Sequence, residues 1–189
     1  MTNFTVLYDS CVLYPFILRD LLMELALHDL FRAKWTNKIH DEWIRSLLKN
    51  KPELEKAQLL RVKELMDSHV LDALVENYEA LEAALNLPDP NDNHVLAAAI
   101  VSSSDVIVTY NLKDFPAEEL EKYNIEAQHP DIFLMHLTEL NEEKFLFAVK
   151  QARRRLRNPP KSIDEYLDIL YNRDLKETSK FLQAHQKFL

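Results

Sequence analysis

Four acidic residues stand far apart in the sequence, each beside a segment that can hold a carboxylate in a shared site. Asp9 and Asp114 each follow a short apolar run. Glu42 lies in a helical stretch, and Asp92 opens a helix. Converging carboxylates repel one another unless a cation neutralises them, and hard cations such as Mg2+ and Mn2+ prefer oxygen ligands. These four residues therefore predict metal-dependent phosphoryl chemistry.

Two of these residues are positioned by apolar runs that have the composition of buried strands. Residues 4–8 and 106–109 are rich in Phe, Val, Ile and Tyr, which is typical of buried parallel strands. Ligand sites in open α/β sheets lie beyond the carboxyl ends of such strands. We therefore expect Asp9 and Asp114 at that edge of the sheet.

Further elements alternate along the chain. Short strands are expected at 33–35 and 125–127, and helices at about 15–30, 37–51, 52–68, 70–87, 92–101, 117–123 and 130–140. This order predicts an α/β protein, a three-layer α/β/α sandwich around a central, mainly parallel sheet. Residues from 141 onwards favour only helices, at 141–156, after a capping box at Ser162, and at 174–189, with a break at 158–160. We expect an α/β domain over 1–140 and a helical extension over 141–189.

The composition excludes several classes of protein. The chain has 189 residues, no glycine and one cysteine. Without glycine there is no dinucleotide-binding fingerprint and no Walker loop, so turns must use Asn, Asp, His and Pro. Cys11 alone cannot form an internal disulfide. No targeting signal or membrane-spanning run is present, so we expect a cytoplasmic protein without a membrane partner.

The net charge of -8 argues at first against a nucleic-acid partner, but it is unevenly spread. The segment 150–161 has six basic residues and no acid, including Arg153, Arg154, Arg155 and Arg157. These arginines could steer RNA to the protein. A solvated basic helix face that pairs with the acidic remainder has equal weight.

The chain resembles the PIN domain. The resemblance rests on Tyr8-Asp9-Ser10, on Glu42, on the segment 87–99 (LPDPNDNHVLAAA) and on 108–116 (VTYNLKDFP), in this order and spacing. It is strongest to the bacterial branch of VapC-type toxins of toxin–antitoxin systems. It covers about residues 3–140, and the tail from Asn141 resembles the helical extension of some toxins of that branch.

This resemblance implies a magnesium- or manganese-dependent endoribonuclease that is held inactive by an antitoxin and often forms a homodimer. Asp9, Glu42, Asp92 and Asp114 fall on the family's acidic positions, so 1–140 would be the nuclease domain. Asp9 and Asp92 would ligate one metal, and Asp114 and Glu42 would complete the site, partly through water. Many relatives have a second Asp where this chain has Asn91. Asp89 is the candidate to replace it, and whether one or two metals bind stays open.

Each assignment has a structural alternative. Asp9 and Asp114 could be turn formers at strand ends, and Asp92 could be a helix cap. Glu42 could be a solvated glutamate, with Asp41 as a competing candidate. Cys11 is expected to be a small buried residue, and His94 to be packed or solvent-facing rather than near substrate. Ser10, Thr109 and Asn111 could orient a carboxylate or phosphate, but local turn capping is at least as good an interpretation.

Two rival functions stay open. One is a structure-specific nuclease that acts on DNA or in RNA processing without an antitoxin. The other is a degenerate, non-catalytic PIN-like module that binds RNA or a protein. Four repelling carboxylates argue against the second rival, and Asn91 is the only residue in its favour.

Overall fold

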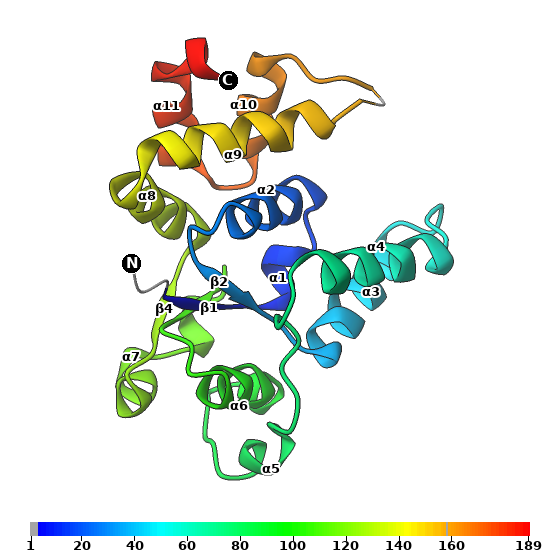
Figure 1. Cartoon of the computed structure of the whole chain (residues 1–189). Helices are drawn as coiled ribbons and strands as arrows, with labels where there is room; N and C mark the ends of the chain where they lie inside the picture. The colour runs from blue at the N-terminus through cyan, green and yellow to red at the C-terminus, as the bar shows by residue number, and fades with distance from the viewer. Residues whose placement is uncertain (1–3, 158) are drawn as a thin grey trace. The chain divides into compact units, whose positions relative to one another are not determined.

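A parallel four-stranded sheet lies at the centre of the first of two structural units in this computed structural model, which describes residues 4–157 and 159–189. Its strand order is β2-β1-β3-β4 (Figure 1). The strands are β1 (Thr5–Tyr8), β2 (Arg32–Lys34), β3 (Val106–Val108) and β4 (Glu126–Gln128). Val6 of β1 lies opposite Ala33 of β2 and Val106 of β3. The predicted α/β class with a parallel sheet is confirmed.

Both faces of this sheet are buried. Val6, Leu7 and Tyr8 follow one another along β1, so their side chains point alternately to the two faces, and all three are 0% exposed. Ile107 and Val108 of β3 are equally buried. This burial suits the predicted three-layer arrangement, because only a sheet that is covered on both sides has fully apolar strands.

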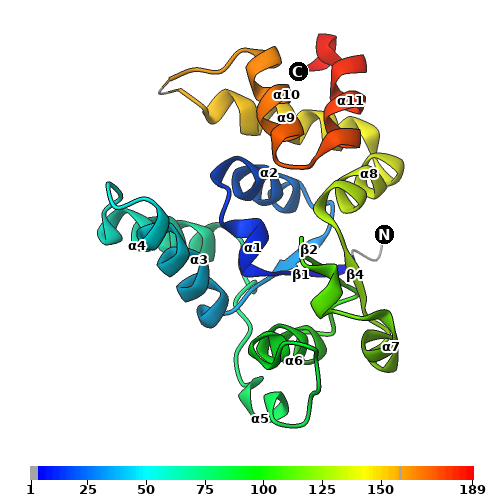
Figure 2. The ribbon, with the colours of Figure 1, turned by 180° about the vertical axis from the view of Figure 1, so that it is seen from behind.

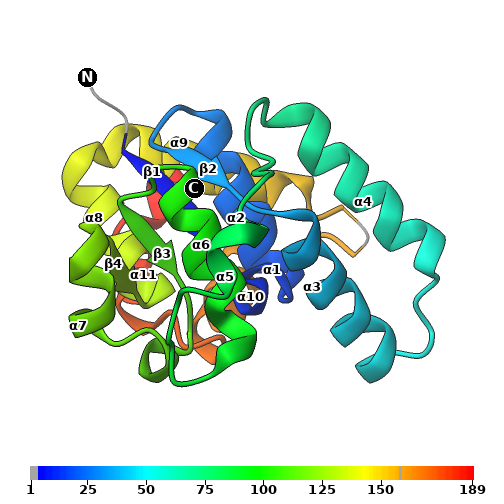
Figure 3. The same ribbon diagram turned by 90° about the horizontal axis from the view of Figure 1, so that it is seen from below.

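The helices of this sheet unit follow the predicted order. They are α1 (Ser10–Leu13), α3 (Asn37–Asn50), α4 (Lys56–His69), α5 (Glu79–Glu82), α6 (Asn93–Val101) and α7 (Ala117–Leu120). α6 packs against β1 and β3, and its buried Ala97, Ala98 and Ala99 allow a close approach to the sheet. α3 and α4 lie side by side (Figure 3).

Two predictions in the segment 52–87 are wrong. α4 begins at Lys56 instead of Pro52, and it buries Leu59 and Met66 while Leu60 and Leu65 are about two-fifths exposed. The helix expected over 70–87 shrinks to the four residues of α5. The cause is a tertiary pairing: the backbone N–H of Trp35 donates to Ala73 O (3.0 Å) and that of Val75 to Trp35 O (2.8 Å). These bonds hold the chain extended where local propensity favours a helix.

Smaller corrections concern element ends. Thr36 caps α3, because its Oγ1 accepts the N–H of Ile39 at 3.0 Å, and the helix ends at Asn50 instead of residue 51. The helix predicted at about 15–30 is α2 (Phe16–Leu27), and the short helix α1 before it was not predicted. Asn158, the start of the predicted break, lies outside the described residues.

The second unit is helical and contains α2 and the helices after His129. These are α8 (Pro130–Leu140), α9 (Glu142–Arg155), α10 (Ile163–Asn172) and α11 (Lys176–Ala184), and α10 and α11 lie side by side (Figure 2). The predicted capping box is present: Ser162 Oγ accepts from Glu165 N, and the Glu165 carboxylate accepts from Ser162 N.

The units do not coincide with the predicted domains 1–140 and 141–189. The sheet unit contains the described residues up to Pro15 and Phe31–His129, whereas the helical unit contains Phe16–Leu30 and Pro130–Leu189. α2 and α8 pack with the C-terminal helices, a tertiary preference that linear order does not reveal. The predicted boundary at residue 140 stays a prediction.

Backbone positions with positive φ, where glycine is usual, are taken mostly by Asp and Asn, two of the residues that the composition predicts. Positive φ angles occur in the described chain at Asp29, Asp72, Asn77, Ser103, Asn124 and Asp174. All but Ser103 are Asp or Asn, whose short polar side chains tolerate the left-handed region. Within the described residues, no helix is both long and apolar enough to cross a membrane.

Candidate active site

Asp9 lies at the carboxyl end of β1 and is 6% exposed. Its backbone N–H donates to Val108 O of β3 at 3.1 Å, which fixes it against the neighbouring strand. Thr109 Oγ1 and Cys11 Sγ donate to its Oδ2 at 2.7 and 3.0 Å, and Ser10 Oγ donates to its Oδ1 at 3.3 Å. These neutral donors orient the carboxylate but leave its charge uncompensated.

Cys11 has a structural part in this arrangement. Burial and the Asp9 charge raise the pKa of its thiol, so the sulfur stays protonated and can donate to Asp9. A protonated thiol is a poor nucleophile.

Asp114 is connected to Asp9 through the loop after β3. The N–H of Asn111 donates to Thr109 Oγ1 at 3.0 Å, and Asn111 Nδ2 donates to Asp114 Oδ2. Thr109 in turn donates to Asp9. Two predicted supporting residues, Thr109 and Asn111, therefore join two predicted acidic residues in one hydrogen-bonded chain.

Asp92 is the electrostatic centre of the cluster. Partial burial is the largest cause that raises its pKa, to about 6, and the negative charges of Asp9, Asp89 and Asp114 raise it further, while His94 lowers it. Asp92 precedes α6, yet its side chain makes no capping hydrogen bond. Asp92 therefore does not cap the helix through its side chain, and other carboxylates lie near enough to raise its pKa.

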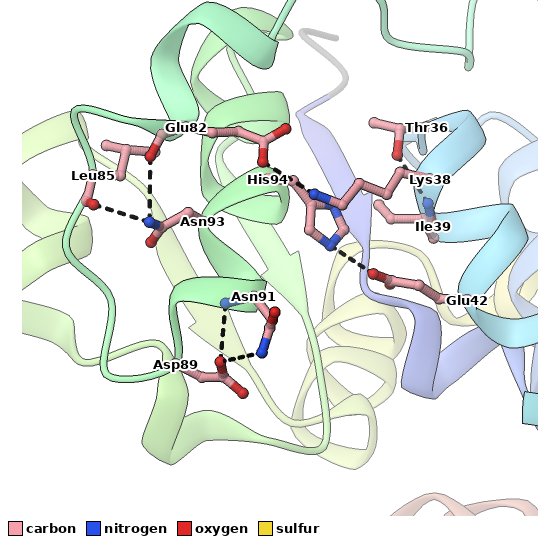
Figure 4. Close-up of polar contacts among 10 residues, drawn as sticks. All are labelled: Thr36, Lys38, Ile39, Glu42, Glu82, Leu85, Asp89, Asn91, Asn93 and His94. Atoms are coloured by element: carbon pink, nitrogen blue, oxygen red, sulfur yellow. Dashed lines mark hydrogen bonds and ion pairs between the residues drawn. The ribbon is translucent and has the colours of Figure 1, made fainter.

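Asp89 has a different local partner. Its Oδ1 accepts both the N–H and the Nδ2–H of Asn91, each at 2.9 Å (Figure 4). It thereby caps the short 3-10 turn Pro90–Asp92. Asp89 was predicted to replace the aspartate that many relatives have at position 91. Its carboxylate is instead hydrogen-bonded to Asn91 itself.

Glu42 lies on α3, and its predicted competitor Asp41 is exposed to solvent. Glu42 Oε1 lies 2.8 Å from His94 Nε2 of α6 (Figure 4). The His94 side chain is 1% exposed and that of Glu42 25%. The contact is short but not aligned as a regular hydrogen bond. Sequence reasoning gave His94 no role, and its place two residues after Asp92 was the available signal.

The four arginines proposed for RNA lie in the helical unit, apart in sequence from the acidic residues. Arg153 donates to Lys161 O at 3.2 Å, and Arg155 pairs with Glu24 of α2. Arg154 and Arg157 are exposed. Two of the four therefore already have partners within the protein.

Among residues 4–157 and 159–189, no group of three or more His, Cys, Asp or Glu side chains is arranged to hold a metal ion. The chemistry of the donors nevertheless fits a hard divalent cation. Asp9, Asp92 and Asp114 offer carboxylate oxygens, and the repulsion that raises the pKa of Asp92 is the kind that a cation relieves.

Comparison with known proteins gives two family matches and one relative. The sequence model of the PIN domain matches residues 5–113, and that of the VapC50 C-terminal domain matches residues 130–184. A protein of Mycobacterium tuberculosis (strain ATCC 25618 / H37Rv) named "Putative ribonuclease VapC50" is 48% identical over 71 residues. The match spans 38% of this chain and 41% of the relative, which is less than half of either protein.

No solved structure matches the chain. The PIN-domain match alone spans more than half of the 189 residues and contains Asp9, Glu42 and Asp92, whereas Asp114 directly follows it. The chain belongs to the PIN-domain family.

Proposed function

We propose that this protein is a divalent-metal-dependent endoribonuclease that hydrolyses RNA phosphodiester bonds and is the toxin of a toxin–antitoxin pair. One observation carries the catalytic part: the carboxylates of Asp9, Asp89 and Asp114 together raise the pKa of Asp92, and His94 offsets this rise only in part. Such a cluster destabilises the folded protein unless a cation binds.

Asp9, Asp92 and Asp114 would hold the Mg2+ or Mn2+ ion, with Glu42 at the edge of the cluster. A bound divalent cation supplies an activated water and stabilises the charge that develops on the phosphate oxygens. Thr109 orients Asp9 and Asn111 orients Asp114 through the hydrogen bonds described above. The proposal requires the three carboxylates to draw closer on binding, because no described group is arranged for a metal.

The choice of RNA is supported by the relative, which is named a ribonuclease. Hydrolysis by water does not use the RNA 2′-hydroxyl, so the acidic site alone does not separate RNA from DNA. A cognate antitoxin, a homodimer and a cytoplasmic location belong to the same proposal. Arg154 and Arg157 are the exposed arginines that could steer RNA.

Cleavage of a mixed pool of structured and single-stranded RNA tests the proposal, with Mn2+, Mg2+ or EDTA present. We expect metal-dependent cleavage by the wild type and none by Asp92→Asn. Asp41→Asn is the matched control, because it removes an exposed carboxylate near Glu42. A DNA pool of matched sequence distinguishes the structure-specific nuclease, which would cut it comparably. Equal cleavage by wild type and Asp92→Asn would contradict the assigned centre.

A non-catalytic binding module is the second candidate, because Asn91 holds Asp89 in a cap. Thermal melting with Mn2+ separates the two functions. A cation that binds only the folded state stabilises it by about 2.7 kcal/mol at 100 times its Kd. We expect this shift for the wild type and its loss in Asp92→Asn. A wild type that neither melts higher with Mn2+ nor cleaves RNA would favour the binding module.

A further inference from the structure

The contact between α3 and α6 contains a residue that the proposed metal site does not use. His94 is 1% exposed, so it has no surface with which to touch an RNA phosphate. Its Nε2 lies 2.8 Å from Glu42 Oε1, and its Nδ1 is buried without a hydrogen-bond partner in the described structure. Glu42 remains 25% exposed, so it faces both His94 and solvent. His94 therefore acts on the chemistry through neighbouring carboxylates, and the one that it contacts directly is Glu42.

A second ion pair joins the same helix to the same segment. Lys38 lies on α3 one helical turn before Glu42, and its Nζ is 3.0 Å from Glu82 Oε2 of α5. Asn93, next to His94, donates to Glu82 O (3.3 Å) and Leu85 O (2.9 Å) (Figure 4). The segment that carries His94 is thereby tied to the partner of Lys38. Because residues four apart share a helix face, Lys38 and Glu42 hold this segment at two points.

Another hydrogen-bonded chain anchors α3 to α4. Trp43 Nε1 can only donate, so His40 Nδ1 accepts its proton at 3.0 Å. His40 Nε2 then donates to Asp67 Oδ1 at 3.0 Å, and Trp35 Nε1 donates to the same oxygen at 2.8 Å. α3 is thus held by α4 as well as by the segment 82–94, and the backbone at Glu42 is well fixed.

We propose that His94 is a positioning residue that holds the Glu42 carboxylate in one orientation at the edge of the aspartate cluster. This inference rests on the proposed function. A glutamate on a helix surface has several rotamers of similar energy, and ordering it costs conformational entropy. The buried His94 removes that freedom before substrate binds, which is how supporting residues keep reacting groups in productive geometry. Lys38 serves only to anchor the helix, because its partner Glu82 is not among the proposed site residues.

The test compares steady-state cleavage over a range of RNA concentrations at saturating Mn2+. The variants are His94→Leu, which has no donor, His94→Gln, which keeps an N–H, Glu42→Gln, and the double variant His94→Leu/Glu42→Gln. Lys38→Met is the matched control, since it breaks the neighbouring ion pair on the same helix. Removing a supporting residue typically lowers activity about 10- to 100-fold. We expect that loss in kcat for His94→Leu, with KM little changed, and partial rescue in His94→Gln.

The double variant should cleave no more slowly than the slower single variant, because both changes remove one contact. Lys38→Met should lower the melting temperature and keep the wild-type kcat. Wild-type kcat in His94→Leu, or losses that multiply in the double variant, would overturn the inference. So would a kcat loss in Lys38→Met as large as that in His94→Leu, because general loosening of α3 would then explain both.

Melting in EDTA tests the contact independently of cleavage and covers the case in which His94→Leu does not fold. If His94 and Glu42 interact, the melting-temperature losses of His94→Gln and Glu42→Gln sum to more than the loss in a second double variant, His94→Gln/Glu42→Gln. Additive losses would overturn the inference. A wild type that fails to cleave RNA would instead overturn the proposed function, whatever the melting cycle shows.

Discussion

Asp92 in the sheet unit and Asp20 in the helical unit are both partly buried aspartates, and burial is the largest cause that raises the pKa of each. Their neighbours differ. The strongest charges on Asp20 are Arg19 and Arg155, which lower its pKa again. The strongest charges on Asp92 are Asp9, Asp89 and Asp114, which raise its pKa further. The charge of the same kind of side chain is therefore balanced by arginines in one unit and opposed by other carboxylates in the other.

Other carboxylates in the helical unit follow the pattern of Asp20. Glu24 is 2% exposed and pairs with Arg155. Asp131 accepts the N–H groups of Glu177 and Thr178, each at 2.9 Å, and Thr178 Oγ1 at 2.7 Å, which caps α11. Buried acids that pair with a cation, or that accept the first N–H groups of a helix, stabilise the fold. An acidic cluster that the protein does not neutralise costs stability and is a candidate site for a cation.

The largest expected effect separates Asp9 from Asp131, two buried aspartates that each accept three hydrogen bonds from other residues. Asp9→Asn should lower RNA cleavage by about 10³-fold or more, because a metal ligand supplies several kcal/mol of transition-state stabilisation. Asp131→Asn should cleave RNA normally but lose about 2 kcal/mol of unfolding free energy, because hydrogen bonds to a charged acceptor weaken. Cleavage rates and thermal melts measure the two effects. The comparison fails if Asp131→Asn loses cleavage and Asp9→Asn retains it.

An intermediate effect is expected at Arg155. Arg155→Met leaves the buried Glu24 carboxylate with His28 Nε2 at 3.4 Å as its remaining ion-pair partner. Removing one partner of a buried pair costs about 3–5 kcal/mol, and the exposed Arg155 head lowers this to about 1–3 kcal/mol. Denaturant unfolding measures the loss. Arg154→Met, an exposed neighbour, should change stability little. Equal stability in both variants would mean that the ion pair between Glu24 and Arg155 contributes nothing measurable to the free energy of unfolding.

The smallest effect is the dependence of stability on pH in EDTA. The pKa of Asp92 is about 6 in the folded protein, against 3.8 for an unperturbed aspartate. As pH rises, the unfolded chain therefore loses this proton at a lower pH than the folded protein does. The free energy of unfolding falls as pH rises from about 4 to 6. The full cost is present above about pH 6, and after allowance for solvent screening it is about 1 kcal/mol. Asp92→Asn should melt higher than wild type near neutral pH and equally below about pH 4. Identical melting curves at every pH would show that the carboxylate cluster is not strained.

Much of the fold followed from local pattern. Strands β1 and β3 were found from buried apolar runs, and α8 from its helical spacing. The capping box at Ser162 was found from its side chains, because capping is a contact within four residues. The failures lie in the segment 52–87, where Trp35 pairs with residues almost forty positions later and overrides helix propensity.

The sequence alone determined the types and order of the acidic residues, and with them the family. The apolar run before Asp9 was enough to predict that this residue lies at the end of a strand. The partners of each carboxylate were decided by the tertiary structure: His94 beside Glu42, and Asn91 on Asp89. Arg155 on Glu24 is a third such pair. The physical reason is that charges interact across space, so their compensation depends on distances that the linear order of residues does not contain.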